Sequence, residues 1–94
     1  MAREIQFQIE PEDALEVFVK QGRRCALSGV PLMFARKGQT ASLDRIDSKL
    51  GYTKDNLQWV HKHINVAKNS LSVSDFVTMC REVVTPADAI QSLR

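Results

Sequence analysis

Cysteine is scarce in this 94-residue chain, and the chain contains no long apolar segment. The two cysteines, Cys25 and Cys80, are too few for the disulfide framework of a small secreted domain, and neither belongs to a C-x-x-C pair that would bind zinc. No hydrophobic run approaches the ~20 residues that cross a bilayer. The acidic, interrupted start, MAREIQFQIEPED, lacks the pattern of a signal peptide. We therefore expect a cytoplasmic protein that makes no contact with membranes.

The length of the chain excludes a second independent core, because a core needs enough chain to bury its apolar surface. Residues 1–94 are therefore predicted to form a single small domain. The net charge of +2 conceals a basic middle: residues 20–68 carry ten basic and three acidic side chains, a net of +7, and the remainder carries −5. Such a segment is expected of a surface that binds a phosphate backbone, and solvated charge explains it nearly as often.

Apolar periodicity and helix-breaking residues predict an α+β fold. Residues 4–9 alternate polar and apolar side chains, which indicates a short strand or an extended arm. A helix is predicted from Pro11 to Gly22, with acidic residues in its first turn, so residues 1–24 form an N-terminal arm and helix. The side chains expected to face the core from this helix are Ala14, Leu15, Val17 and Phe18.

Residues 25–34 are predicted to form two short strands around a turn at Ser28 and Gly29. A basic loop follows at residues 35–40. The packing residues expected in the two strands are Leu27, Val30, Leu32 and Phe34.

The core motif at residues 41–69 is predicted to be strand, loop, strand and helix. Leu43 and Ile46 belong to the first strand, and a loop at residues 47–56 turns at Gly51. Residues 57–60 form the return strand, with Trp59 as a large core anchor. Helical spacing then begins at His61 and ends near Asn69.

A C-terminal helix and tail are predicted at residues 72–94. The helix runs from Ser74 to Val84, is capped by Ser72 or Ser74 with Asp75 in its first turn, and ends at Pro86. Its expected buried side chains are Val73, Phe76, Val77 and Cys80.

Polar residues of the core motif stand out by their spacing. Asp44 is followed directly by Arg45, Asn56 comes twelve residues after Asp44, and Asn65 comes nine residues after Asn56. Lys68 lies three residues further on. The pattern SLDRID…NLQWVHK…N resembles the HNH endonucleases, whose ββα scaffold holds one divalent metal, and it is most similar to small bacteriophage HNH proteins. The resemblance implies a ββα-metal core flanked by an N-terminal and a C-terminal helix.

The resemblance also implies roles for the matched residues. Asp44 and Asn65 would bind the metal, and Asn56 would brace the loop and orient the base. Both ligands present oxygen, which favours Mg²⁺ or Mn²⁺. The cation would contact a non-bridging phosphate oxygen and the departing 3′ oxygen, leaving 5′-phosphate and 3′-hydroxyl ends. In the absence of this spacing, Asp44 would be expected to cap a turn or to pair with Arg45 or Lys68.

Two positions depart from the family pattern. The catalytic His that normally follows the Asp is replaced by Arg45, which cannot accept a proton at neutral pH but can bind a phosphate. Many relatives also hold a zinc ion with two C-x-x-C pairs. Those places are taken here by Cys25 with Ser28 and by His61 with Ile64, so no structural zinc is expected.

His61 and His63 are the only histidines of the chain. His61 stands four residues before Asn65 and therefore shares the predicted metal face, whereas His63 is expected to point elsewhere. Two roles are open for His61. It can be the substitute base or an extra ligand, or it can have a structural role at the start of the helix.

The sequence therefore predicts a metal-dependent DNA endonuclease or nicking enzyme of the HNH type, encoded by a bacteriophage and acting in the bacterial cytoplasm. Its catalytic set is Asp44, Arg45, Asn56, His61 and Asn65. The residues expected at DNA phosphates are Arg36, Lys37, Arg45, Lys62 and Lys68. The alternative is a catalytically impaired protein of the same fold that binds DNA, or that binds and blocks a host defence protein.

Overall fold

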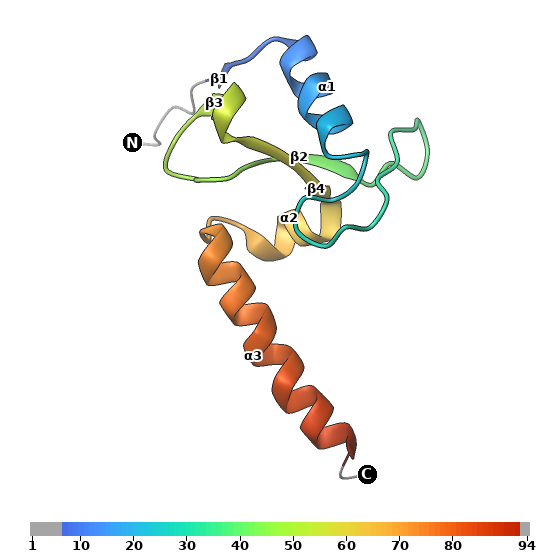
Figure 1. Ribbon diagram of the computed structural model, residues 1–94, viewed down its shortest axis with the longest axis vertical. Coiled ribbons are helices and arrows are strands. Elements are labelled where there is room, and N and C mark those ends of the chain that lie inside the picture. Colours follow the sequence, from blue (N-terminus) through green and yellow to red (C-terminus); the bar gives the residue numbers. More distant parts are fainter. Residues whose placement is uncertain (1–6, 93–94) are drawn as a thin grey trace.

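The computed structural model describes residues 7–92 and has an α+β fold. Its antiparallel sheet pairs β2 (Ala41–Arg45) with β4 (Leu57–His61). α1 (Pro11–Lys20) precedes this sheet and α2 (Lys62–Lys68) follows it directly, as Figure 1 shows. The predicted order of strand, loop, strand and helix is therefore present in the chain.

Three smaller elements surround the sheet. β1 (Phe7–Gln8) pairs in parallel with β3 (Tyr52–Thr53), and a 3₁₀ turn, η1 (Lys54–Asn56), leads into β4. β3 and η1 lie within the predicted loop at residues 47–56, which is therefore more ordered than the sequence indicated. The predicted N-terminal arm is described only from Phe7 onward, and its first residues lie outside the described part.

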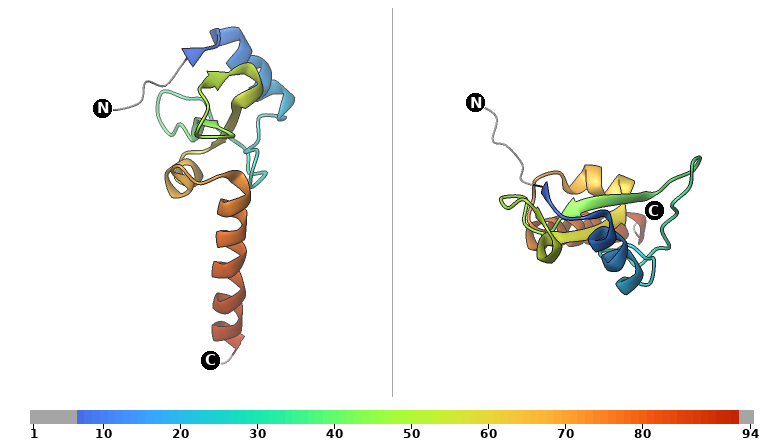
Figure 2. Two further views of the ribbon diagram at one scale, coloured as in Figure 1. Left: turned by 90° about the vertical axis from the view of Figure 1, so that its left-hand side faces the viewer. Right: turned by 90° about the horizontal axis from the view of Figure 1, so that it is seen from above.

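α1 and α2 cover opposite faces of the β2–β4 sheet (Figures 1 and 2). Successive side chains of a strand point to opposite faces, so Trp59 faces α1 whereas its neighbour Gln58 faces α2. The Trp59 Nε1 donates a hydrogen bond of 2.8 Å to the carbonyl of Ala14 in α1. The α1 face is thus mainly apolar, and the α2 face carries the polar residues described below.

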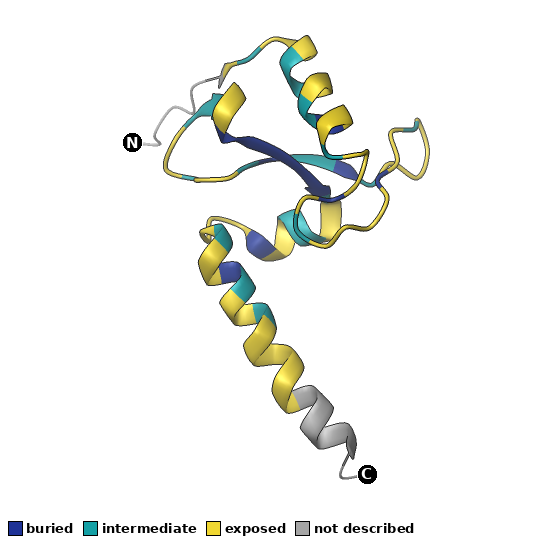
Figure 3. Cartoon of the chain, viewed as in Figure 1, coloured by how far each residue is buried: buried dark blue, intermediate teal, exposed yellow. Residues whose placement is uncertain are grey.

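The apolar core is centred on β4, which is buried along almost its whole length (Figure 3). The rings of Phe18, Phe34 and Trp59 meet edge to face, with centroids 5.0–5.6 Å apart. Such pairs add to the hydrophobic stabilisation of the rings. The buried members of the core cluster are Phe18, Cys25, Leu32, Ala41, Trp59 and Val60.

α1 forms where the sequence predicted it. Pro11 occupies its first turn, and the Asp13 carboxylate accepts a hydrogen bond of 3.0 Å from the backbone N–H of Glu10. Phe18 is buried, and Ala14 and Val17 pack against the core as expected. Leu15 is exposed, contrary to the prediction, because it lies to one side of the stripe that α1 buries.

The prediction of two strands at residues 25–34 is wrong. The described structure has a single bridge between Arg24 and Pro31, closed by a Cys25 N–H to Val30 carbonyl bond of 2.8 Å. Gly29 has a φ of +78°, and Pro31 has no N–H to donate to a ladder, so the segment turns instead of extending. The side chains of Leu32 and Leu27 pack inward as predicted, and the ring of Phe34 contacts Phe18 and Trp59 although much of this residue stays exposed. Val30 and, beyond the end of β2, Ile46 are exposed.

α3 (Val73–Ser92) begins as predicted but extends beyond its expected end. The Ser72 hydroxyl accepts a 3.1 Å hydrogen bond from the N–H of Asp75, which caps the helix. Phe76 is buried, and its neighbours Val73, Val77 and Cys80 are half-buried. Pro86 lies inside the helix, where its fixed φ is compatible with helical geometry and the exposed surroundings let water bind the freed carbonyl. The helix projects from the body, as Figure 2 shows.

None of the helices within residues 7–92 combines the length and the apolar character needed to span a bilayer.

Candidate functional site

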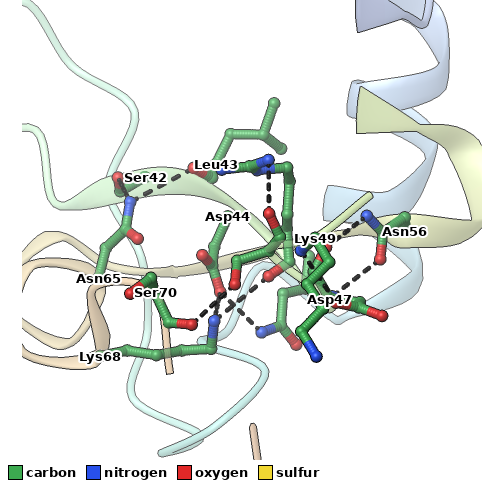
Figure 4. A network of polar contacts seen from close by, with 12 residues as sticks. Ser42, Leu43, Asp44, Asp47, Lys49, Asn56, Asn65, Lys68 and Ser70 are labelled. Atoms are coloured by element: carbon green, nitrogen blue, oxygen red, sulfur yellow. Dashed lines mark hydrogen bonds and ion pairs between the residues drawn. The ribbon is translucent and has the colours of Figure 1, made fainter. Parts of the chain in front are cut away.

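A polar layer lies between α2 and the sheet (Figure 4). Ser42 and Asp44 alternate along β2 and so point to the same face, while Asn65 and Lys68 are three residues apart on α2 and face the strand together. Asn65 meets Ser42, and Lys68 meets Asp44. The predicted metal ligands therefore share one strand–helix junction.

Asp44 is buried and already has two partners. The Lys68 ammonium lies 3.2 Å from its Oδ2, and Gln58 Nε2 donates a hydrogen bond of 3.0 Å to the same oxygen. Gln58 is the cross-strand neighbour of Asp44 in the β2–β4 register. A buried carboxylate needs such compensation because removal from water is costly for the charged form.

Asn65 is held by its amide nitrogen. Its Nδ2 donates to the Ser42 hydroxyl at 2.6 Å and to the Leu43 carbonyl at 3.3 Å. A carbonyl only accepts hydrogen bonds, so the NH₂ end of the amide must face Leu43. The opposite end, Oδ1, is thereby turned away from β2, and Figure 4 shows it on the side of Asp44. This orientation presents an oxygen as a metal ligand.

Asn56 is buried and uses both ends of its amide on the loop between β2 and β3. Its Nδ2 donates to the carbonyls of Asp47 at 3.0 Å and Gly51 at 2.9 Å, and its Oδ1 accepts from the Asp47 N–H at 2.9 Å. Three backbone groups of residues 46–51 are therefore fixed by one side chain. The side chain braces this loop and has no part left to contact a substrate.

Arg45 holds the same loop from its other side. Its Nη1 donates to the carbonyls of Ser48 at 2.9 Å and Leu50 at 3.0 Å, and its guanidinium lies 5.4 Å from the centre of the Tyr52 ring. The side chain is half-buried. In this conformation Arg45 stabilises the loop instead of reaching out to a phosphate.

His61 lies at the N-terminus of α2, and its Nδ1 accepts a hydrogen bond of 3.1 Å from the His63 N–H. This is the structural role that the sequence left open. The exposed His63 ring lies beside the His61 ring, with the two ring centroids 4.8 Å apart. That His63 points away from the metal face stays a prediction. A neutral imidazole whose Nδ1 accepts must carry its hydrogen on Nε2. In this arrangement the Nε2 of His61 is a hydrogen-bond donor.

The predicted DNA contacts divide into two groups. Arg36, Lys37 and Lys62 are exposed and free to meet a phosphate backbone. Lys68 is not, because its side chain has no exposed surface. Its prediction as a DNA contact is contradicted by this burial. The hydrophobic stem of Lys68 is enclosed as α2 packs on the sheet, which brings its ammonium to Asp44.

The positions that correspond to the family's zinc ligands lie next to each other. The Cys25 sulfur accepts hydrogen bonds of 3.4 Å from the N–H groups of Ser28 and His61, so the turn at residues 25–29 contacts the end of β4. Burial alone would raise the pKa of the Cys25 thiol. Hydrogen bonds from Ser28 and from the His61 N–H outweigh burial and lower that pKa below its ordinary value.

Two members of the site, Gln58 and Ser42, were not predicted from the sequence. Ser42 could have been found from its spacing, since it stands two residues before Asp44 and so shares its face. Gln58 could be found only from the strand register, because a polar residue between Leu57 and Trp59 gives no signal of its own.

The chemistry of the donors fits a hard divalent cation. Asp44 and the Asn65 oxygen are the oxygen donors that Mg²⁺ and Mn²⁺ prefer. Within the described residues, no three His, Cys, Asp or Glu side chains gather at one point, so further ligands would be water or phosphate oxygens. No protein-family model, curated protein or solved structure matches this chain.

Proposed function

We propose that the protein is a metal-dependent DNA endonuclease or nicking enzyme with an HNH-type ββα-metal core. One observation carries the proposal: α2 is docked on β2 so that the Asn65 oxygen is turned away from its two hydrogen-bond acceptors and toward the side of Asp44. The motif spacing in the sequence and the orientation of the Asn65 side chain both support the same site.

The residues of the site would divide the work. Asp44 and Asn65 would hold the cation, which supplies charge stabilisation to the phosphate and the departing oxygen. Asn56 and Arg45 keep the loop at residues 46–51 in place from two sides. His61 would donate a hydrogen bond from Nε2 to a phosphate oxygen. The attacking water would release its proton to bulk water, and the departing 3′ oxygen would take up a proton from bulk water.

A second candidate is a binding protein of this fold that has lost hydrolysis. Its support is the ion pair of Asp44 with Lys68, which satisfies the carboxylate without a metal, together with Arg45 at the place of the base. Such a protein would bind DNA or a host protein through the exposed basic residues.

Cleavage of a supercoiled plasmid in Mg²⁺, in Mn²⁺ and in EDTA separates the two candidates. The nuclease is expected to nick or linearise the plasmid with either metal and to be inactive in EDTA. Asp44→Asn is expected to abolish cleavage, because it removes the charge while keeping an oxygen for Gln58. Asp55→Asn, at an exposed position in η1, is the matched control and should cleave normally.

Calorimetric titration of Mg²⁺ and Mn²⁺ completes the test. One divalent site that Asp44→Asn removes and Asp55→Asn retains is expected. A folded protein without metal-dependent heat, melting shift or cleavage would rule out the nuclease and leave the binding protein.

A further inference from the structure

Lys68 is the most deeply buried charged residue among those the structure describes. Its side chain is 0% exposed, and its ammonium lies 3.2 Å from Asp44 Oδ2 and 3.3 Å from the Arg45 carbonyl. Lysine is almost never enclosed in this way without an opposite charge, because the ammonium loses its hydration. The Asp44 carboxylate supplies that charge.

The Asp44 carboxylate would therefore serve both the ion pair with Lys68 and the binding of a divalent cation. Lys68 and Gln58 both contact Oδ2, and Oδ1 is the carboxylate oxygen that neither of them contacts. A divalent cation held by the Asp44 carboxylate would share that group with the ammonium, inside a protein region where like charges repel strongly. The cation and the ammonium therefore compete for one negative charge.

We propose that Lys68 sets the metal affinity of the site as a built-in competitor for Asp44. Its ammonium neutralises the carboxylate while no cation is bound, so the polar layer stays intact. It then weakens the binding of any cation that arrives. This inference rests on the proposed function, because it takes Asp44 as a metal ligand.

Binding of Mn²⁺ in the absence of DNA tests the proposal without any measurement of activity. Calorimetry and the electron paramagnetic resonance signal of free Mn²⁺ give the dissociation constant for the wild type, Lys68→Met and Lys20→Met. Methionine keeps the apolar stem of lysine and removes the charge. Lys68→Met is expected to bind Mn²⁺ at least about tenfold more tightly, because the repulsion is gone. Lys20 is an exposed lysine of α1, so Lys20→Met should bind as the wild type does.

A second variant locates the gain in affinity. Asp44→Asn/Lys68→Met carries neither charge and is expected to lose the tight site. If it binds Mn²⁺ as tightly as Lys68→Met, the competition does not take place at Asp44 and the proposal is overturned.

Lys68→Met leaves a buried carboxylate without its cation, so its folding is followed by circular dichroism in the same titration. A variant that is unfolded without metal and refolds as Mn²⁺ is added supports the proposal. One that stays unfolded at saturating Mn²⁺ overturns it, because the metal then does not replace the ammonium.

The remaining outcomes distinguish a failure of the proposed competition from a failure of the proposed nuclease function. Equal Mn²⁺ affinity in the wild type and a folded Lys68→Met overturns the competition and leaves the metal site standing. Absence of Mn²⁺ binding in both folded proteins overturns the proposed nuclease, and the competition with it.

Discussion

Asn56 and Asn65 carry the same side chain and use it in opposite ways. Asn56 bonds both ends of its amide to the backbone of the loop at residues 46–51, whereas Asn65 bonds only its nitrogen to Ser42 and Leu43. The first amide is fully used in holding structure. The second keeps its oxygen for another partner, and this difference separates a bracing residue from a candidate ligand.

Replacement of Asn56 tests the bracing role. Asn56→Ala removes three hydrogen bonds and leaves the backbone groups of Asp47 and Gly51 without them, so we expect a loss of about 2–4 kcal/mol in the free energy of unfolding in urea. Asn56→Asp keeps the acceptor for the Asp47 N–H and loses both donors, so it should not restore stability. Gln8→Ala, at an exposed position in β1, controls for the loss of an amide.

Arg45→His would place an imidazole where the family has its base. We expect this variant to cleave plasmid faster than the wild type at neutral pH, because an imidazole with a pKa near ~6.5 can accept the proton of water. We also expect a lower melting temperature, because the bonds to the Ser48 and Leu50 carbonyls are lost. Arg45→Gln loses the same charge without gaining a base. A folded, metal-loaded Arg45→His that remains inert would favour the binding protein.

The sequence predicted which residues belong to the site better than it predicted what they do. Spacing placed Asp44 on a strand and Asn65 on a helix that faces it, and the structure brings both to one junction. Spacing could not show the direction of the Lys68 side chain, because this depends on how α2 rotates as it packs. An ammonium expected at the surface therefore lies inside, against Asp44.

At the scale of the elements, α1 is tied to the entry of β4 by an exposed ion pair. The Lys54 ammonium lies 2.9 Å from Glu16, and Lys20 lies 3.2 Å from the same carboxylate. The hydrogen bonds and charges of Lys54 and then Lys20 lower the pKa of Glu16, and the Glu16 carboxylate raises the pKa of Lys54. The stability of the fold therefore has a small dependence on pH through this ion pair.

The sign of this dependence follows from the lowered pKa of Glu16. Its stabilisation is present above the pKa of an unfolded glutamate, about 4.3, and is lost as the pH falls through the lower folded value. Glu16→Gln should therefore unfold at a lower urea concentration than the wild type at pH 7, and the difference should vanish at acidic pH, below the lowered pKa of Glu16. Glu12→Gln, in the same helix and exposed, serves as the control. An unchanged difference at both pH values would contradict the role of the charge.

Strong local patterns predicted the elements well, and weak ones did not. α1 has Pro11 at its start and Gly22 after its end, and β4 carries three apolar residues, Leu57, Trp59 and Val60. The segment at residues 25–34 looked like two strands because its apolar residues are dense, but its pairing stops at the single bridge between Arg24 and Pro31, and Pro31 has no N–H to extend it. Pro86 was expected to end α3, but the helix continues through this residue. No tertiary packing from the described residues constrains the helix at this position.

The whole molecule is elongated, with extents of 51 × 35 × 23 Å and a radius of gyration of 15.4 Å, against about 12 Å for a compact chain of this length. The excess comes from α3, which leaves the body after its first turns and is exposed at residues 81–86 (Figure 3). The exposed basic residues named for DNA binding lie in the body instead, in the loop at residues 35–40 and at the start of α2.

DNA affinity is expected to depend on this basic body and to be sequence-independent. Arg36→Glu/Lys37→Glu should weaken binding to all duplexes alike and reduce the slope of log K against log salt by about 2, since each phosphate contact contributes about 0.9. Fluorescence anisotropy with labelled duplexes at several salt concentrations measures both. Lys20→Glu/Arg81→Glu makes the same change in net charge on α1 and α3. If both pairs weaken binding equally, the loop is not the contact surface.

The alkylation rate of the buried Cys25 sulfur can report local opening of the core. An alkylating reagent reaches this thiol, which is 3% exposed, only when the turn at residues 25–29 lifts from the end of β4. Cys80, on the half-buried side of α3, should react first and supply the reference rate. The ratio of the two alkylation rates would then report how often the turn at residues 25–29 opens in the native protein.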